Sequence, residues 1–338
     1  MRGHFKMRLK VALSLAETRL EGRGMHVEER EFRVEKREDT CREMRRYVAT
    51  IGFFDGVHRG HQYLIGQLRR EASALGLGSM LVTFDRHPRQ VLHADYVPSL
   101  LSTLDEKVEL LWQTQVDEVR VLHFTPEMAS MDAQQFMREV LADELHVDVL
   151  LMGYDHRFGR GGGTFPEYCA WGREAGIQVM LASALPGEKV SSSVIRRLLS
   201  QGDVTGADEL LGRPYRLTGM VRGGHRVGRL LGFPTANISL PAGKLIPAGG
   251  VYAVRVQLPD GEWRAGMLNI GHRPTLHNGE NVSVEVNILD FEGDLYNKEI
   301  SVDFVERLRD EQAFPSLDDL RRQLSRDKME VRKFTEGM

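Results

Sequence analysis

The stretch Ile51-Gly-Phe-Phe-Asp-Gly-Val-His-Arg-Gly-His61 joins a short apolar run to a segment with helical periodicity. Residues 47–51 have the character of a buried strand, the glycines of the stretch allow a tight turn, and apolar side chains then recur with a helical period. The predicted order is therefore strand, loop and helix. Because the first turn of a helix offers free backbone N–H groups and the positive end of its dipole, the loop is a candidate phosphate site flanked by His58 and His61.

The loop lacks the lysine and the G-x-x-x-x-G-K-[ST] spacing of a P-loop, so imidazoles and backbone amides would hold the phosphate. Imidazoles can stabilise the negative charge that develops on a nucleotide α-phosphate as pyrophosphate leaves. This chemistry favours nucleotidyl transfer. The alternative is a pair of solvated histidines at the start of a helix.

Three further motifs follow this loop: Thr83-Phe-Asp-Arg-His-Pro88, Gly153-Tyr-Asp-His-Arg-Phe-Gly159 and Ser191-Ser-Ser-Val-Ile-Arg196. Together with GFFDGVHRGH, and in this order, they resemble the nucleotidyltransferase part of bacterial bifunctional riboflavin kinase/FAD synthetases. The resemblance extends from about residue 47 onward. The H-x-G-H pattern also occurs in class I aminoacyl-tRNA synthetases, but those enzymes pair it with a lysine-rich KMSKS-type loop, which this sequence lacks.

The composition fits a soluble enzyme that acts on small molecules. A chain of 338 residues suggests two domains, and a net charge of −3 gives no reason to expect nucleic acid as a partner. Cys41 and Cys169 form no metal or disulfide pattern, which is typical of a reducing cytoplasm. No apolar run reaches the roughly 18 residues of a membrane span. Protein partners are not indicated.

Residues 1–46 differ from the rest, with thirteen Lys or Arg against nine Asp or Glu. The apolar run in residues 8–16 is short and leads into charged residues, so we predict no export signal. Met7, Met25 and Met44 are alternative translation starts. We interpret this segment as a charged extension, disordered or artefactual, that both activities can do without.

Residues 47–204 alternate between strand-like and helix-like segments, which predicts a Rossmann-like, mostly parallel sheet covered on both faces. In such sheets ligands bind at the carboxyl ends of the strands. The predicted strands are residues 47–51, 80–84, 118–122, 147–152 and 177–181, and the predicted helices are residues 61–75, 105–115, 132–145 and 164–176.

The motifs supply the candidate residues of this adenylyltransferase domain. One serine of the Ser191–Arg196 motif is expected to cap a helix, and phosphate contact is expected most of Ser192 and Arg196. The resemblance implies that the motif binds ATP and that the loops around Asp85 and Asp155 line the pocket for FMN. His156 stands where the family usually has phenylalanine. The predicted nucleotide-binding residues are Gly52, Phe53, Asp55, Gly56, Ser192, Ser193 and Arg196, and the predicted flavin-binding residues are Asp85, Asp155 and Phe158.

Residues 205–338 are dominated by strand-like segments, so we place the domain boundary after residue 204. The segments 216–221, 251–258, 263–270, 282–289 and 300–305 predict an antiparallel β-barrel, with an amphipathic helix over residues 317–333 packed on it. Ser316 and Asp319 predict a capping arrangement at the start of that helix.

The segment of this domain that we expect to bind phosphate is residues 223–237, GGHRVGRLLGFPTAN. Its glycines suit a flap that approaches phosphates through its backbone, and Arg226 and Arg229 add positive charge. A bare PTAN would be a turn, but after GRLLGFP it resembles the riboflavin kinase motif, which implies that Thr235 and Asn237 bind Mg²⁺ and phosphate. Gly224, Gly228 and Arg229 complete the predicted nucleotide-binding residues.

Alternation along residues 284–289 places Glu285 on an open strand face, opposite Val284 and Val286. A carboxylate there can accept the proton of the riboflavin hydroxyl during attack on the γ-phosphate of ATP, although an isolated strand glutamate would simply be solvated. Asn287 stands where the family commonly has histidine. The resemblance further implies that Arg309 and Phe314 bind the flavin.

The predicted function is flavin cofactor synthesis in two steps. The C-terminal domain would convert ATP and riboflavin into FMN and ADP, and the N-terminal domain would convert ATP and FMN into FAD and pyrophosphate. Two alternatives stay open: only one domain is active, or the chain is a flavin- or nucleotide-binding protein without turnover.

Overall fold

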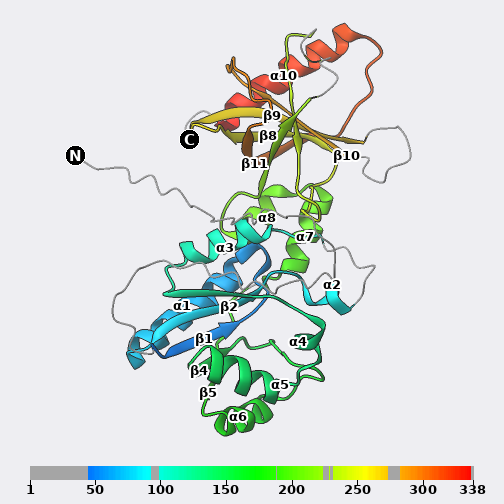
Figure 1. Ribbon diagram of the computed structural model, residues 1–338. Helices are drawn as coiled ribbons and strands as arrows, with labels where there is room; N and C mark the ends of the chain where they lie inside the picture. Colours follow the sequence, from blue (N-terminus) through cyan, green and yellow to red (C-terminus); the bar gives the residue numbers. More distant parts are fainter. Residues whose placement is uncertain are drawn as a thin grey trace, which may run out of the picture. The chain divides into compact units, whose positions relative to one another are not determined.

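The computed structural model describes residues 45–92, 99–187, 189–223, 228, 231–272 and 282–335. The predicted extension therefore lies outside the described residues, apart from Arg45 and Arg46. The described residues form an open parallel sheet with its helices and a separate closed barrel (Figure 1). None of their helices is long and apolar enough to cross a membrane.

The open sheet has the strand order β3-β2-β1-β4-β5, and all its neighbouring strands are parallel. The strand order reverses at β1, because β2 and β3 lie on one side of it and β4 and β5 on the other. Sheets of this kind bind ligands in the crevice at such a reversal, outside the carboxyl ends of the strands. The strands are β1 (Tyr47–Ile51), β2 (Gly78–Phe84), β3 (Glu118–Leu122), β4 (Val147–Met152) and β5 (Gln178–Leu181), which confirms the predicted set.

Helices cover both faces of this sheet. Val48 of β1 packs with α1 on one face, and its neighbour Ala49 packs with η2 and α6 on the other. The predicted helix over residues 132–145 is divided, because its second part has the wider π-helical turn. The helical segments are η1 (Asp55–Val57), α1 (Arg59–Leu75), α2 (Pro88–Leu92), α3 (Leu104–Gln113), α4 (Pro126–Ser130), α5 (Ala133–Gln135), η2 (Phe136–Glu144) and α6 (Phe165–Glu174).

The barrel closes in the order β10-β7-β6-β11-β8-β9 with antiparallel neighbours, as predicted. Alternate side chains fill its interior, and those of β10 are Val284, Val286 and Ile288. The PTAN segment continues into a short strand, β7, that was not among the predicted strands. The strands are β6 (Arg216–Arg222), β7 (Ala236–Ser239), β8 (Gly250–Gln257), β9 (Trp263–His272), β10 (Val282–Ile288) and β11 (Glu299–Arg309).

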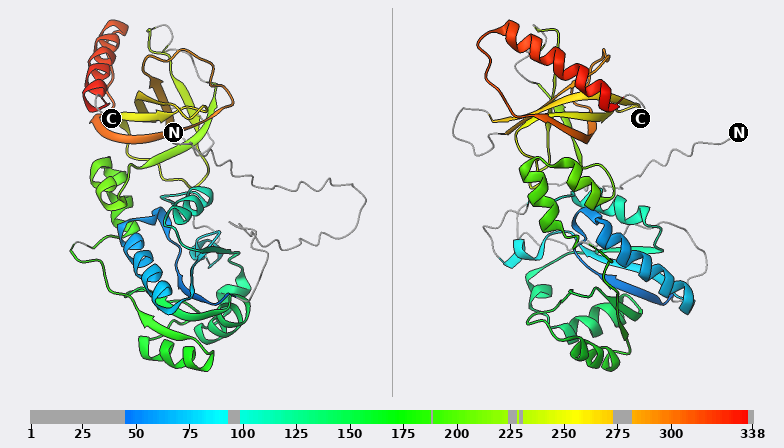
Figure 2. Two further views of the ribbon diagram at one scale, coloured as in Figure 1. Left: turned by 90° about the vertical axis from the view of Figure 1, so that its left-hand side faces the viewer. Right: turned by 180° about the vertical axis from the view of Figure 1, so that it is seen from behind.

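Helix α10 (Leu317–Thr335) lies along the outside of the barrel, where Figure 2 shows it in red. Its Val331 is buried with Leu289 and residues of β8 and β9. The N–H of Asp319 donates to Ser316 Oγ at 3.2 Å, and Ser316 Oγ donates to the Asp319 carboxylate at 2.6 Å. The predicted capping arrangement is thus confirmed.

Two helices follow the sheet along the chain: α7 (Ser192–Gln201) and α8 (Val204–Leu211). Their buried side chains, including Ile195 and Leu211, belong to the same apolar cluster as the barrel interior. Helix α7 therefore carries a predicted ATP motif at its start while its buried face packs with the barrel.

Candidate functional sites

The loop after β1 has an unusual backbone. Phe54, Gly56 and Val57 all have positive φ, with Val57 at 41°. This region is strained for a β-branched residue, and such strain persists only where the surroundings hold it in place. At Gly56, with φ 76°, an added Cβ would lie 2.8 Å from the Leu101 side chain, so the position excludes larger residues.

Donors from four separate parts of the chain hold the carbonyl groups of this loop. Thr83 Oγ1 donates to the Phe53 carbonyl at 3.2 Å, and Ser192 Oγ donates to that of Asp55 at 3.0 Å. Arg213 donates to the Gly56 carbonyl at 2.7 Å, and the Gln62 amide donates to that of Val57 at 2.8 Å. The loop is therefore fixed in shape before any ligand binds.

His58 and His61 meet at the start of α1, with ring centroids 3.6 Å apart and nearly parallel planes. His58 is 5% exposed and is the N-cap of the helix, since its Nδ1 accepts the N–H of His61 at 3.3 Å. That bond leaves the ring proton of neutral His58 on Nε2. Nδ1 of His61 is buried and has no hydrogen-bond partner among the described residues.

Burial sets the charge of this pair. It lowers the pKa of His58 to about 4, and it lowers the pKa of His61 well below its ordinary value, with His58, His156 and Lys107 acting in the same direction. Both imidazoles are therefore neutral near pH 7. In that state they offer N–H donors, and not fixed positive charge, to a phosphate.

The Ser191–Arg196 motif lies against the same loop. Ser191 Oγ accepts the N–H of Val194 and caps α7, whereas Ser192 binds the loop and Ser193 is exposed. Arg196 Nη2 lies 2.5 Å from the Asp55 carboxylate, and its Nε donates to the carbonyl of Ser99. The motif and the loop thus meet although more than 130 residues separate them.

Asp55 is buried at 3% exposure and faces protein donors. Its carboxylate accepts the N–H groups of Leu101 and Ser102 at 3.0 to 3.1 Å, and it pairs with Arg196. This predicted nucleotide-binding residue therefore positions Arg196 and the loop. Gly52, at the end of β1, donates its N–H to the Val82 carbonyl.

Sequence reasoning missed Lys107 of α3, a lysine only 2% exposed beside the site. Its Nζ donates to the Phe84 carbonyl at 2.7 Å and lies 4.0 Å from the ring centre of Phe53. Burial lowers the pKa of Lys107 to about 8, while Asp55 and Asp85 oppose the shift. Its burial could have been predicted from the sequence, because Lys107 is spaced three residues from Leu104 and four from Leu111 and so lies on the apolar face of α3.

The predicted flavin-binding residues of the parallel-sheet part are Asp85, Asp155 and Phe158, and they differ in burial and in partners. Burial acts to raise the pKa of Asp85, but hydrogen bonds from the Phe124 N–H and from His123 outweigh it and hold that pKa below its usual value. Asp155 is exposed, whereas Phe158 packs on the core with its ring 4.9 Å from that of Tyr168. These three predicted residues therefore have different surroundings.

In the barrel, Thr235, Asn237 and Glu285 come together. Asn237 pairs with Glu285 across β7 and β10, and Thr235 Oγ1 donates to the Glu285 carboxylate at 3.1 Å. Asn287 holds the segment beside β10 by donating to the Pro234 carbonyl at 2.7 Å. The strand face predicted to be open is accessible at Glu285, whereas Asn287 is buried.

A cavity of about 310 Å³ adjoins this group on the barrel-interior side. Val286 and Ile288 line it, so it lies across β10 from Glu285, and Thr235 is among its lining residues. Phe291, Gly293, Asp294, Leu295 and Tyr296 also line it. A cavity with both apolar and polar lining, beside a hydroxyl and a carboxylate, suits a ligand with a flat ring and a polar end.

The remaining predicted site residues of the barrel part, where the structure describes them, lie in different surroundings. Gly224, Arg226 and Arg229 lie outside the described residues, while the Gly228 carbonyl accepts the N–H of Phe233 at 2.8 Å. Arg309 binds Asp327 of α10 through Nε and Nη2 and lies 5.9 Å from the Phe314 ring centre. Arg309 therefore anchors α10 and lies near Phe314.

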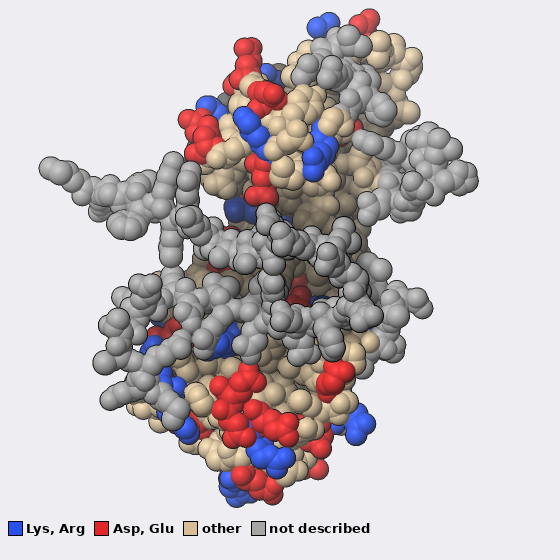
Figure 3. Space-filling model, in the orientation of Figure 1, with Lys and Arg blue, Asp and Glu red and all other residues tan. Residues whose placement is uncertain are grey.

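The surface charge agrees with the composition. The uncovered parts of the face in Figure 3 show acidic and basic side chains interspersed, with a group of acidic side chains over the parallel-sheet half.

Comparison with known proteins assigns the two halves. A family described as FAD synthetase matches residues 41–194, and one described as riboflavin kinase matches residues 211–335. Two relatives are bifunctional riboflavin kinase/FMN adenylyltransferases: one from Haemophilus influenzae is 38% identical over 82% of this chain and 91% of its own length, and one from Escherichia coli K12 is 37% identical over 85% and 92%.

A crystal structure described as a macrolide-efflux protein from Streptococcus pneumoniae is also similar, with a TM-score of 0.78 and 31% identity over 87% of this chain and 96% of that one. The fold agrees with both family matches, since the parallel sheet lies within the first range and the barrel within the second. The chain belongs to the family of bifunctional riboflavin kinase/FMN adenylyltransferases.

Proposed function

We propose that this chain phosphorylates riboflavin with one ATP and adenylylates the resulting FMN with a second. The proposal rests on two separate groups of residues. Thr235, Asn237 and Glu285 meet where β7 pairs with β10 in the barrel, and His58 and His61 stack at the start of α1 in the parallel-sheet part. Each group suits a different phosphate of ATP. We further propose that the domains divide near residue 204 and that the enzyme works in the cytoplasm.

In the kinase step, Glu285 accepts the proton of the terminal ribityl hydroxyl as that oxygen attacks the γ-phosphorus. The bond between the γ-phosphorus and the bridging oxygen breaks, and ADP leaves with the electron pair. The cavity and Glu285 lie on opposite faces of β10. We therefore place the adenosine of ATP in the cavity and riboflavin on the Glu285 side, with Thr235 between them.

The side-chain oxygens of Thr235, Asn237 and Glu285 are of the kind that binds Mg²⁺. Thr235 offers a hydroxyl and Asn237 an amide oxygen beside the Glu285 carboxylate, and Mg²⁺ prefers a few hard oxygen ligands together with substrate phosphates. Thr235 and Asn237 would hold the ion, which when bound supplies charge neutralisation of the ATP phosphates. Asn287 keeps the two ligands in place by fixing Pro234 against β10.

In the adenylyl step, a phosphate oxygen of FMN attacks the α-phosphorus of ATP, and pyrophosphate leaves with the electrons of the broken bond. His58 donates its Nε2 proton in a hydrogen bond to an α-phosphate oxygen, and His61 acts beside it. Because both rings are buried and neutral, they give up little solvation when ATP arrives. The strained, fully held loop keeps these donors in place, which is the preorganisation that lowers such barriers.

One assay separates this proposal from the alternatives. Purified protein is incubated with riboflavin, ATP and Mg²⁺, and the flavins are resolved by HPLC. The proposal predicts FMN followed by FAD. FMN alone would mean that only the barrel is active, and unchanged riboflavin with measurable flavin binding would mean a binding protein without turnover.

A further inference from the structure

Lys244 belongs to the barrel part of the chain, yet its side chain binds the other part. It follows β7 and is 8% exposed. Its Nζ donates to the Leu101 carbonyl at 2.9 Å and pairs with Glu106 at 2.5 Å. The backbone adds to this contact, since Leu100 and Lys244 form a parallel bridge.

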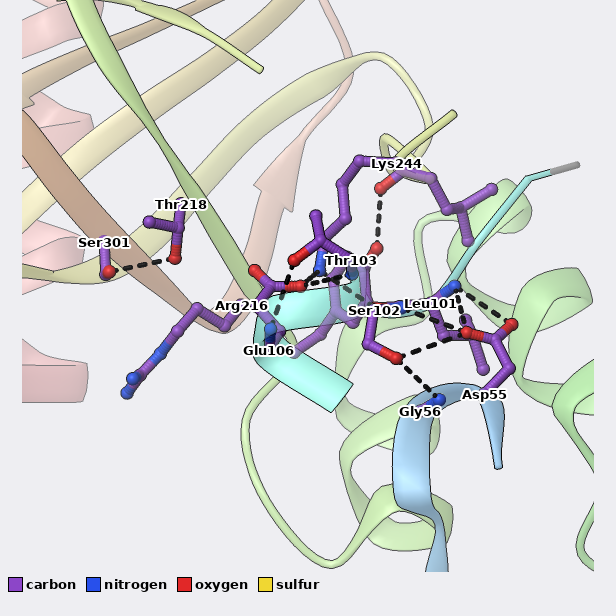
Figure 4. A network of polar contacts seen from close by, with 12 residues as sticks. Asp55, Gly56, Leu101, Ser102, Thr103, Glu106, Arg216, Thr218, Lys244 and Ser301 are labelled. Carbon is purple, nitrogen blue, oxygen red and sulfur yellow. Dashed lines mark hydrogen bonds and ion pairs between the residues drawn. The ribbon is translucent and has the colours of Figure 1, made fainter. Parts of the chain in front are cut away.

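The residues that Lys244 binds are the ones that hold Asp55. Leu101 accepts from Lys244 through its carbonyl and donates to Asp55 through its N–H. Ser102 donates to Asp55 and accepts the Gly56 N–H at 3.0 Å through its Oγ. Figure 4 shows this continuous set of contacts from Lys244 to Asp55.

Glu106 connects the ion pair to the start of α3. Its carboxylate accepts the Thr103 N–H at 2.9 Å while it pairs with Lys244. Removing the lysine charge would leave this largely shielded carboxylate, 17% exposed, without its cation. A buried charge that loses its partner drives rearrangement around it. The segment that would rearrange is the one that supports the adenylyltransferase loop.

We propose that Lys244, although part of the kinase barrel, is a positioning residue for adenylyl transfer. It fixes residues 101–106, and these fix Asp55, which orients the histidine loop and Arg196. The inference rests on the proposed role of that loop in ATP binding. Since small misplacements of reacting groups can cost about 10²-fold in rate, loss of Lys244 should be seen in the distant activity.

The test measures both activities in one preparation of full-length Lys244→Met, which removes the charge and keeps most of the volume. We expect kcat/KM for adenylation of supplied FMN to fall about 10- to 100-fold. Riboflavin phosphorylation should stay within about twofold of wild type, which also reports that the barrel is folded. The double variant Lys244→Met/Glu106→Gln should recover part of the lost adenylation, because no unpaired carboxylate remains.

Lys328→Met is the matched control. Lys328 also belongs to the barrel part and pairs with a carboxylate, Asp290 at 3.4 Å, so both activities should stay at wild-type level. Unchanged adenylation in Lys244→Met would overturn the inference. A parallel loss of both activities would overturn it too, because Lys244 would then only stabilise the fold. Absence of adenylation in the wild type would instead refute the proposed function.

Discussion

The depressed pKa of His58 makes stability depend on pH in a way that can be calculated. The pKa is about 4 in the folded chain and about 6.5 when the chain is unfolded. Between these values the unfolded chain binds a proton that folded His58 does not. This contribution to stability is therefore complete above pH 6.5 and is lost as the pH falls towards 4.

Between pH 7.5 and pH 5 the unfolded imidazole gains most of one proton, and linkage converts this into a loss of about 2 kcal/mol. His58→Asn removes the titrating group and keeps a good N-cap for α1. Over this pH interval the wild type should therefore lose about 2 kcal/mol more than the variant. Most of the difference reports His58, and His61 contributes to it as well, because His58 helps to lower the pKa of His61.

The assay is urea unfolding at each pH, followed by tryptophan fluorescence. Trp112 and Trp171 report the parallel-sheet half, and a variant with Trp263→Phe removes the barrel signal. Equal pH dependence of wild type and His58→Asn would refute the reasoning, since His58 would then titrate normally in the folded chain. An NMR titration of the imidazole gives the same quantity independently.

Four further predictions follow from the sites. His61→Ala should lower FMN adenylation by about 10²- to 10³-fold and leave phosphorylation intact, as measured by the two separate initial rates. Thr235→Val should weaken phosphorylation and its response to Mg²⁺ while adenylation persists, which a Mg²⁺ titration of both reactions would check. Lys107→Met should raise the pKa of His61, because a positive neighbour is removed, and NMR titration measures the shift. A chain that starts at Met44 should keep both activities and a cooperative thermal transition.

Local patterns predicted the elements well. The apolar run before the histidine loop, the glycines in that loop and the alternation along residues 284–289 depend on neighbours in sequence, so a strand, a turn and an inward face follow directly. The contact between Thr235 and Glu285 was not predicted, because the two residues lie 50 positions apart and no spacing argument connects them. Only the pairing of β7 with β10 brings them together.

What the sequence did not reveal is which polar groups bind each other. Asp55 had the pattern of a ligand-binding residue, yet Leu101, Ser102 and Arg196 bind its carboxylate from 46 to 141 positions away. Arg309 stays a predicted flavin residue by resemblance, and its ion pair with Asp327 of α10 was not predicted. Such partners depend on the tertiary fold, and nothing in the residues beside them predicts the contact.

Two separate sites on one chain are the central claim, and an HPLC time course with single-site variants tests it most directly. With riboflavin, ATP and Mg²⁺, Glu285→Gln should form FMN about 10²- to 10⁴-fold more slowly yet still convert supplied FMN to FAD. His58→Ala should instead accumulate FMN, and mixing the two variants should restore FAD formation. If both variants lost the same step, or if the mixture still failed to make FAD, the assignment of two independent sites would be contradicted.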